Sequence, residues 1–356
     1  MSDASAISIC DLYVGLGGFS AGAIAAGANV IIGVDCESVP LRTWSANVPS
    51  GRAVLAKLGP DGSAINLPAP SPGLHVHLSP PCTELSLARA GNTTAAGVQD
   101  GLGQMRWCLD LVLERGDLSW SLENVSTPAT RALLTEFADR FADRVAWASL
   151  DAADYGAAQT RTRLIAGPPE LLRVLQQMPV ARRVSVREAF AARGLEPPAT
   201  HFKNQTRSRD GVPCMRSVEE AAFTVCASHA LTWCDASGRT VRVMTARESA
   251  VLMGIPSRWR LPSRSRDAAR AVGNALSVEM ARAIVEAAAS VLSGTPPPRA
   301  ELSSTPTPPA EVPLARSSDD GLRRVRRRLR AIEGLLRELV ESRGDADDGE
   351  ADGGRG

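Results

Sequence analysis

The chain has 356 residues, of which 44% are hydrophobic and 22% charged, so it can bury a core and form one or two ordinary domains rather than a disordered or fibrous protein. No apolar run approaches the roughly 18 residues that a membrane span needs. Residues 1–10 also lack the basic flank and cleavage pattern of a secretory signal. We therefore expect an intracellular protein with no membrane contact.

The cysteines and the charge distribution narrow the class further. Seven cysteines with no C-x-x-C pair argue against both a disulfide framework and a zinc site, so we expect reduced thiols and no bound metal. The net charge of +1 hides a division. Residues 1–169 carry 11 basic and 16 acidic side chains, whereas residues 170–270 carry 17 and 9. The second part suits a polyanion such as nucleic acid, unless it is only a solvated arginine surface.

Short apolar runs alternate with amphipathic helical segments through the first 167 residues. In chain order these elements are residues 6–12, 18–26, 30–34, 73–78, 101–114, 119–122, 132–141 and 163–166. Such alternation predicts an α/β fold with a doubly wound, mainly parallel sheet. In sheets of this kind, ligands bind at the carboxyl ends of the strands.

The composition changes after this region. We expect a catalytic domain at 1–168, a small irregular domain at 169–243, a return to the catalytic domain at 244–293, a proline-rich linker at 294–318, a basic helix at 319–343 and a disordered acidic tail at 344–356. Apolar residues spaced alternately three and four apart make 322–340 a marginal amphipathic helix. That helix could be solvated, self-associate or contact nucleic acid.

A glycine-rich segment connects the first strand to the first helix. It reads Asp11-Leu-Tyr-Val-Gly15-Leu-Gly17-Gly18, and its glycines allow the backbone to approach a ligand closely. The exposed N–H groups at the start of the helix favour a carboxylate or a phosphate. Asp35, at the end of the next apolar run, is placed to accept hydrogen bonds from ribose hydroxyls. Together these features indicate an adenosine-type ligand.

Three further motifs follow predicted strands or lead into them. Ser79-Pro80-Pro81-Cys82 holds a thiol at a strand end, which suits a nucleophile. The other two are Glu123-Asn124-Val125 and Gln159-Thr-Arg161-Thr-Arg163, where charged side chains adjoin core strands. Such charges are costly unless they are paired or functional, and a salt bridge between Glu123 and Arg163 is the simplest alternative.

In this order, the four motifs resemble those of the cytosine-C5 methyltransferase family. Arg247-Glu248-x-x-x-Leu-x-Gly254-x-Pro256 and Gly273-Asn274-Ala275 are similar to the family's last two motifs, so the resemblance covers about residues 8–290. It implies S-adenosylmethionine as cofactor and double-stranded DNA as partner. The cofactor-binding residues that it implies are Asp11, Tyr13, Gly15, Gly17, Gly18, Asp35, Pro81, Asn274 and Ala275.

The resemblance also implies a mechanism. Cys82 adds to C6 of cytosine, Glu123 holds and protonates N3, and Arg163 orients the base at O2 with support from Arg161. The activated C5 then takes the methyl group. Because a stacked base cannot be reached, the target cytosine is expected to flip out of the duplex, and residues 83–100 look like the loop that closes over it.

Nucleic-acid contacts are expected from the closing loop, the Gln159 motif and the small domain. The candidates are Ser86, Arg89, Gln159, Arg207, Arg209 and Arg216, together with His229 and Trp233. His75 and His77 alternate on the strand before Cys82, and we interpret them as structural because no third metal ligand lies nearby. The short recognition domain suggests a short target sequence.

Departures from the family pattern and alternative functions remain at this stage. Tyr13 stands where the family has Phe, Thr83 replaces a common Gln, and an acidic cofactor residue is missing, with Ala64 in its place. The tRNA-modifying branch shares the machinery but usually carries C-F-T, whereas this sequence reads Phe223-Thr-Val-Cys226. A non-catalytic DNA-binding paralogue would be favoured by loss of Cys82 or Glu123, and a nicotinamide oxidoreductase explains only the cofactor loop.

Overall fold

The apolar runs form the strands of a seven-stranded sheet. The computed structural model describes residues 7–62, 67–85, 94–116, 118–178, 182–207 and 213–295. The strands are β1 (Ser8–Leu12), β2 (Asn29–Asp35), β3 (Arg52–Leu55), β4 (Leu74–Leu78), β5 (Ser119–Asn124), β6 (Ala146–Asp151) and β7 (Thr162–Gly167). Linker 294–318 beyond Thr295, helix 319–343 and tail 344–356 lie outside the described residues.

The strand order is β3-β2-β1-β4-β5-β7-β6. Neighbouring strands from β3 to β5 are parallel, whereas β7 runs antiparallel to both β5 and β6. The predicted mainly parallel α/β sheet is therefore confirmed. The chain reverses its direction of winding between β1 and β4, and ligands of doubly wound sheets bind at the carboxyl ends of the strands at such a point.

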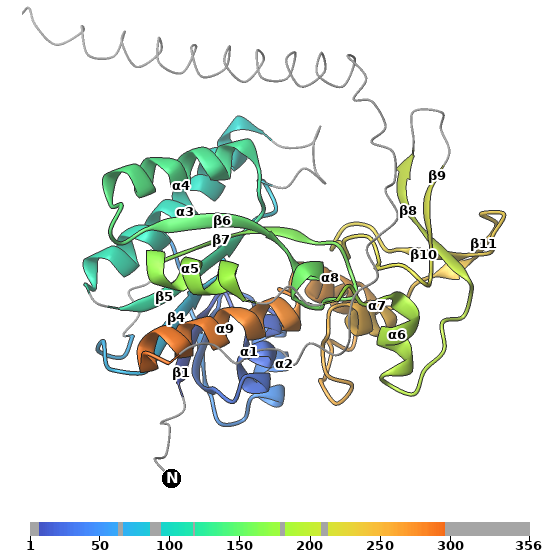
Figure 1. Ribbon diagram of the computed structural model, residues 1–356, viewed down its shortest axis with the longest axis horizontal. Helices are drawn as coiled ribbons and strands as arrows, with labels where there is room; N and C mark the ends of the chain where they lie inside the picture. The colour runs from blue at the N-terminus through green and yellow to red at the C-terminus, as the bar shows by residue number, and fades with distance from the viewer. Residues whose placement is uncertain are drawn as a thin grey trace, which may run out of the picture. The chain divides into compact units, whose positions relative to one another are not determined.

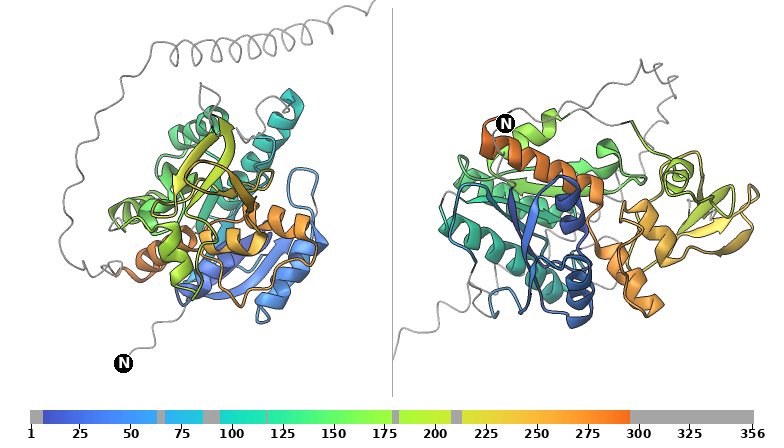
Figure 2. Two further views of the ribbon diagram at one scale, coloured as in Figure 1. Left: turned by 90° about the vertical axis from the view of Figure 1, so that its right-hand side faces the viewer. Right: turned by 90° about the horizontal axis from the view of Figure 1, so that it is seen from below.

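Helices cover both faces of the sheet (Figures 1 and 2). On one face lie α1 (Gly18–Ala25), α5 (Pro169–Gln177) and α9 (Val278–Ser293), whose buried residues share one apolar core. On the other face, α3 (Ala95–Glu114) and α4 (Pro128–Arg140) share a second core with β4 and β5. A further helix, α2 (Ser38–Asn47), buries Leu41 and Trp44 beside β2.

Two boundaries differ from the sequence-based prediction. Helix α3 begins at Ala95, where the Thr94 side chain accepts a hydrogen bond from Gly97 N, so the predicted loop at 83–100 ends earlier than expected. Helix α5 packs against α9, β6 and β7, which places residues 169–177 with the large sheet rather than with the small domain. Apolar periodicity alone did not show which sheet that helix would cover.

The small lobe is an antiparallel sheet with one helix against it. Its strands, in the order β11-β10-β8-β9, are β8 (His201–Arg207), β9 (Pro213–Ser217), β10 (Thr232–Cys234) and β11 (Thr240–Val243), and its helix is α6 (Val186–Ala191). Phe190 and Phe202 pack edge-to-face on the buried Trp233, with ring centroids 5.7 and 6.2 Å away. The chain then returns through α7 (Ala246–Leu252) and α8 (Ser265–Asn274) to α9.

We expect Gly22→Ala to destabilise the fold. A Cβ at Gly22 would lie 2.4 Å from Ala281 Cβ and 2.6 Å from Val278 O, so α1 and α9 would have to separate. Overpacking of this kind costs about 1–3 kcal/mol in the free energy of unfolding. Thermal or urea denaturation measures the change.

The matched control is Gly103→Ala on α3, where a Cβ would meet no atom within 4 Å. This control is expected to stabilise the helix by about 0.5–1 kcal/mol. Equal stabilities of the Gly22 variant and the wild type would contradict the tight packing of α1 on α9.

Candidate active site

Two of the motifs meet at the carboxyl edge of β4 and β5. Residues 79–82 leave β4 at its end, and Ser79 N donates to Leu12 O, which places this turn beside the end of β1. Asn124, at the end of β5, donates from Nδ2 to Pro80 O at 3.1 Å. The turn that carries Cys82 is therefore fixed to both neighbouring strands.

Glu123 and Arg163 form an ion pair next to this turn. Arg163 Nε lies 2.9 Å from Glu123 Oε1, and each side chain is only 12% exposed. Because β7 is antiparallel to β5, the beginning of β7 lies at the edge where β5 ends, and this brings the two charges together. The predicted salt bridge is thus observed, and both of its side chains also lie near Cys82. A partly buried pair of this kind is weak evidence for a stabilising role.

The thiol of Cys82 is kept protonated by its surroundings. Burial raises its pKa, and the nearby Glu123 carboxylate raises it further, while Arg163 and Arg161 act in the opposite direction. Both arginines and Glu123 are therefore close enough to Cys82 to influence its charge. A thiol of this kind needs assistance before it can attack a substrate.

Arg161 is buried and joins three segments of the chain. Its guanidinium donates from Nη1 to Val225 O at 2.7 Å, and from Nη2 to Gly273 O and Ala275 O at 3.1 and 2.9 Å. Burial, and then repulsion by Arg163, lowers its pKa to about 9. Its Nε has no hydrogen-bond partner. Arg161 therefore lies within electrostatic reach of Cys82 while its other nitrogens hold the small lobe and the turn after α8.

Gln159 is also fully buried, and its amide is occupied within the protein. Its Nε2 donates to Leu252 O at 3.0 Å, and its Oε1 accepts from Val225 N at 3.0 Å. The residue forms a β-bridge with Ala222. Gln159 thus links the large sheet to the small lobe through hydrogen bonds. Its burial does not fit the expected direct contact with nucleic acid.

Other expected nucleic-acid residues also differ in their placement. Arg216 donates to Ala221 O and Ala222 O and stacks on Phe223 with its Cζ 4.1 Å from the ring centroid. Trp233 has no exposed surface, so the expectation that it contacts nucleic acid is wrong in this arrangement. His229 is exposed. Arg207 is placed as part of β8 by its backbone, whereas Ser86, Arg89 and Arg209 lie outside the described residues.

The glycine-rich loop after β1 is held in its conformation by two tryptophans. Its backbone is left-handed at Tyr13, Gly15 and Gly17, with φ values of 61°, 52° and 87°. Trp259 donates from Nε1 to Leu16 O at 3.0 Å, and a Cβ at Gly17 would come within 2.6 Å of Trp44. The sequence showed the glycines but gave no signal for either tryptophan.

Asp35 fixes the same loop from the end of β2. Its Oδ2 accepts from Gly15 N and its Oδ1 accepts from Glu37 N, both at 2.8 Å. Burial raises the pKa of this carboxyl group, although the two backbone donors oppose the shift. Each oxygen keeps a further lone pair, which fits the ribose hydroxyls of an adenosine-type ligand.

Asp11 presents an unsatisfied oxygen beneath the loop. Its Oδ2 accepts from Ser20 Oγ at 2.5 Å, and Ser20 in turn accepts from Trp44 Nε1 at 2.9 Å. Its Oδ1 is buried without any partner, and burial raises the pKa of Asp11 to about 7. An orphaned buried carboxylate oxygen suits a cationic group such as an ammonium. Sequence analysis identified Asp11 but missed Ser20.

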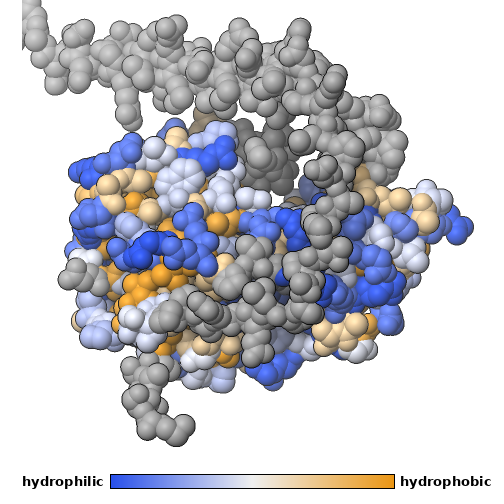
Figure 3. Space-filling view, viewed as in Figure 1, coloured by the Kyte–Doolittle hydropathy of each residue, from blue (hydrophilic) through white to orange (hydrophobic). Residues whose placement is uncertain are grey.

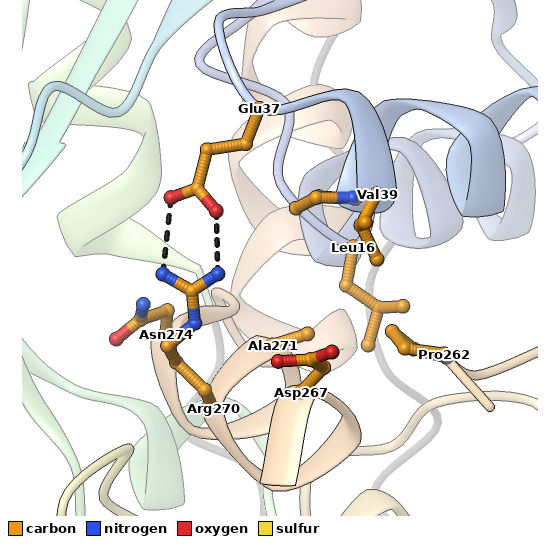
Figure 4. Close-up of a pocket in the computed structure, with 9 residues that line it drawn as sticks. Leu16, Glu37, Val39, Pro262, Asp267, Arg270, Ala271 and Asn274 are labelled. Carbon is orange, nitrogen blue, oxygen red and sulfur yellow. Dashed lines mark hydrogen bonds and ion pairs between the residues drawn. The ribbon is translucent and has the colours of Figure 1, made fainter. Parts of the chain in front are cut away.

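A pocket joins the glycine loop to the last motif (Figure 4). Leu16 of the loop, Glu37 and Val39 after β2, and Asn274 at the end of α8 all line it. Arg270 of α8 pairs with Glu37 across this pocket. Ala275 lies against Gly18: a Cβ added to Gly18 would be 3.0 Å from Ala275 Cβ. The predicted cofactor residues from both ends of the chain are therefore adjacent.

The seven-stranded sheet with its reversed β7, together with this site, defines a Rossmann-like methyltransferase fold. Residues 7–167 and 180–290 match the family described as C-5 cytosine-specific DNA methylase, and the chain belongs to that family. No curated protein is similar enough in sequence to match the chain.

Three solved structures share the fold. A prophage-encoded protein from E. coli, described as a DNA modification methyltransferase, is 19% identical with a TM-score of 0.56, covering 81% of this chain and 100% of its own. A DNMT2 variant from Spodoptera frugiperda is 13% identical with a TM-score of 0.51, covering 80% and 99%. The Entamoeba histolytica methyltransferase EhMeth is 14% identical with a TM-score of 0.51, covering 81% and 99%.

The described residues hold neither a metal-binding cluster nor a membrane-spanning helix. No cluster of histidine, cysteine and acidic residues there could hold a metal ion. Likewise, none of the helices in these ranges is both long and apolar enough to cross a membrane.

We expect Glu123→Gln to lower the pKa of the Cys82 thiol. The carboxylate opposes ionisation of the thiol, so its removal leaves Arg163 and Arg161 to favour the thiolate. The pH dependence of alkylation at Cys82, followed by peptide mass spectrometry, should shift to lower pH. Glu136→Gln, which removes an exposed carboxylate from α4, serves as the matched control. Identical labelling profiles in the wild type and the Glu123 variant would contradict the proposed coupling.

Proposed function

We propose that the protein is a DNA cytosine-5 methyltransferase that uses S-adenosylmethionine. The observation that carries this proposal is the grouping of Cys82 with the Glu123–Arg163 pair at the carboxyl edge of the sheet, beside the end of β1. A nucleophile, a carboxyl group and a guanidinium are the three groups needed to activate a cytosine ring at C6, N3 and O2. Family membership supports the same chemistry.

The protein groups act in sequence. Cys82 loses its thiol proton and its sulfur bonds to C6, while Glu123, once protonated, donates to N3 and so prevents negative charge from building up on the ring. Arg163, released from its ion pair as Glu123 becomes neutral, is free to donate to O2. C5 then takes the methyl group and loses its proton to solvent, the C6–sulfur bond breaks to release the thiolate, which regains a proton, and the N3 proton returns to Glu123, which gives it up before the next turnover. One net proton is released in each turnover.

S-adenosylmethionine supplies an electrophilic methyl group when bound. Asp35 would accept from its ribose hydroxyls, and the unpartnered oxygen of Asp11 would receive its ammonium group. Its carboxylate would meet the N–H group of Gly18, where α1 begins. The rest of the cofactor site would be lined by Tyr13, Gly15, Pro81, Asn274 and Ala275.

Double-stranded DNA is the proposed substrate, and the base must leave the stack to reach Cys82. We assign the recognition surface to the small lobe, together with the segment after Cys82 that contains Ser86 and Arg89. The tRNA-modifying branch of the family is the competing assignment, and its C-F-T element has no counterpart at Phe223-Thr-Val-Cys226.

The direct test is transfer of labelled methyl to duplex DNA and to total tRNA in parallel. We expect label in DNA, recovered as 5-methylcytosine, and none in DNA with Cys82→Ala. Glu123→Gln should slow transfer by about 10²–10⁴, the usual contribution of a positioned acid. Label in tRNA alone would show that the substrate is RNA and not DNA. Label in neither nucleic acid would refute the proposed activity.

The pH dependence of cofactor binding tests the role of Asp11. Its pKa is raised to about 7 by burial, so the carboxylate that would pair with the ammonium is depleted below that pH. We expect the affinity for S-adenosylmethionine to rise about tenfold between about pH 6 and pH 8, in proportion to the ionised fraction.

Asp11→Asn should bind more weakly and should lose this slope in calorimetric titrations. Asp35→Asn is the comparison: it should weaken binding while leaving the slope in place. A slope that persists in Asp11→Asn would assign the titration to another group.

A further inference from the structure

A file of serine and histidine side chains runs along β4 and β5, in which His75, His77 and Ser121 are buried and the end residues Ser79 and Ser119 are partly exposed. His75 Nδ1 lies 2.8 Å from Ser119 Oγ, and His75 Nε2 lies 2.9 Å from Ser121 Oγ. Ser121 Oγ is 2.8 Å from His77 Nδ1, and His77 Nε2 is 2.9 Å from Ser79 Oγ. Neither histidine has any exposed surface, and the proposed mechanism uses none of these groups.

The two ends of the file lie at opposite ends of the strands: Ser119 begins β5, and Ser79 follows the last residue of β4. Ser119 lines a pocket together with Leu118, Arg144, Leu171 and Leu292. Figure 3 shows apolar atoms gathered in this region, between α5 and the C-terminal end of α9. Ser79 is at the other end, within the turn that carries Cys82. The file therefore connects a solvent-facing pocket to the catalytic edge.

Ser79 and Glu123 are neighbours across the two strands. Leu78 pairs with Leu122, so each of these two residues follows one member of that pair. Side chains alternate along a strand, which puts Ser119, Ser121 and Glu123 on one face, and strands lie about 4.8 Å apart. No hydrogen bond joins Ser79 and Glu123 within the described residues, so the step from the Ser79 hydroxyl to the Glu123 carboxyl would run through one bridging water.

The file can be ordered in only two ways. Burial lowers the pKa of His75 to about 3 and that of His77 well below its usual value, so both rings are neutral and each has one donor and one acceptor nitrogen. Ser121 has a single proton and must donate to one ring while accepting from the other. Both histidines therefore share the same tautomer, and all the hydrogen bonds point the same way along the file.

We infer that this file is a reversible proton relay for Glu123, an inference that rests on the proposed methyltransferase function. Before attack, a proton enters at Ser119, each group passes its own proton to the next, and Ser79 delivers one proton to the Glu123 carboxylate. After methyl transfer, N3 returns that proton to Glu123, and the relay carries it back out.

The chemistry of Glu123 matches what such a file can do. A neutral imidazole that has passed one proton forward holds its hydrogen on the other nitrogen, and a second transfer in the same direction would need the ring to turn over. His77 cannot turn easily, because it stacks on Phe19 at 3.5 Å between centroids with an interplanar angle of 3°. One proton inward and one outward in each turnover restores the starting order without any ring rotation.

Other charged groups near the file are few. On β1, Asp11 pairs in register with His77, and on β5 and β7 the pair Glu123–Arg163 stands at the catalytic end. Helix α1 has no charged residue. On α9, Glu279 lies against Gly254, and Arg282 pairs with Glu286. The pocket end carries Asp143 and Arg144.

The test is single-turnover methyl transfer by the full chain, bound to duplex DNA, measured between about pH 6 and pH 9. We expect Ser79→Ala and Ser121→Ala to slow transfer on the order of tenfold at the alkaline end, a part of the usual contribution of acid catalysis. The slowing should shrink toward acid pH, because the higher proton concentration of the solvent then replaces the supply through the relay. Ser79→Thr, which keeps the hydroxyl, should behave as the wild type.

Ser290→Ala on α9 removes a buried hydroxyl outside the file and should leave the pH profile unchanged. Slowing that is equal at every pH would overturn the relay and leave the file a packing role, and so would wild-type rates in both alanine variants. If the wild type and Ser290→Ala transfer no methyl group to DNA, the proposed function fails, and this inference fails with it.

Discussion

The buried guanidinium of Arg161 is the interaction on which the arrangement of the site depends. Its three carbonyl acceptors belong to the small lobe and to the turn between α8 and α9, while its backbone N donates to Asp151 at the end of β6. A buried cation is costly unless it has hydrogen-bond acceptors, and here the two Nη atoms have three carbonyl acceptors while Nε has none. The segments that carry these carbonyls are therefore constrained together, because moving one of them would leave the buried charge with fewer acceptors.

Burial also sets the protonation states of the groups that the proposed chemistry uses. It raises the pKa of the Cys82 thiol, which therefore favours its neutral form, and it raises the pKa of the Asp11 carboxyl to about 7, so that group is ionised less readily than a solvent-exposed carboxyl. Burial makes the ionised forms costly, and a ligand of opposite charge or an electrophilic ring would make them favourable. Burial thus disfavours the Cys82 thiolate and the Asp11 carboxylate until a ligand binds.

Much of the sheet and the site could be predicted from the sequence because the signals are local. The strand at Ser8–Leu12, the glycines after it, and the placement of Cys82 and Glu123 at strand ends are legible from neighbouring residues. Long-range partners gave no such signal. Trp259 donates to Leu16 O, which lies 243 residues away in the chain, and Gln159 was expected to contact nucleic acid although its amide is buried and bonded within the protein. His75 and His77 were interpreted as structural, and their alternation alone did not reveal the serines that connect them.

The chain enters and leaves the small lobe at points that are both tied to the large sheet. Helix α5 packs under β6 and β7 before the lobe, and after it Gly273 is seated so closely on the 226–227 backbone that a Cβ would lie 2.3 Å from Ala227 N. The small lobe is thus an insertion in the large domain. Backbone atoms of residues 222–227 make the contacts that attach it. The lobe's helix α6 and its strands β8 to β11 are joined to the large sheet through residues 222–227, where the contacts on the lobe's side come from main-chain atoms such as Val225 N and Val225 O.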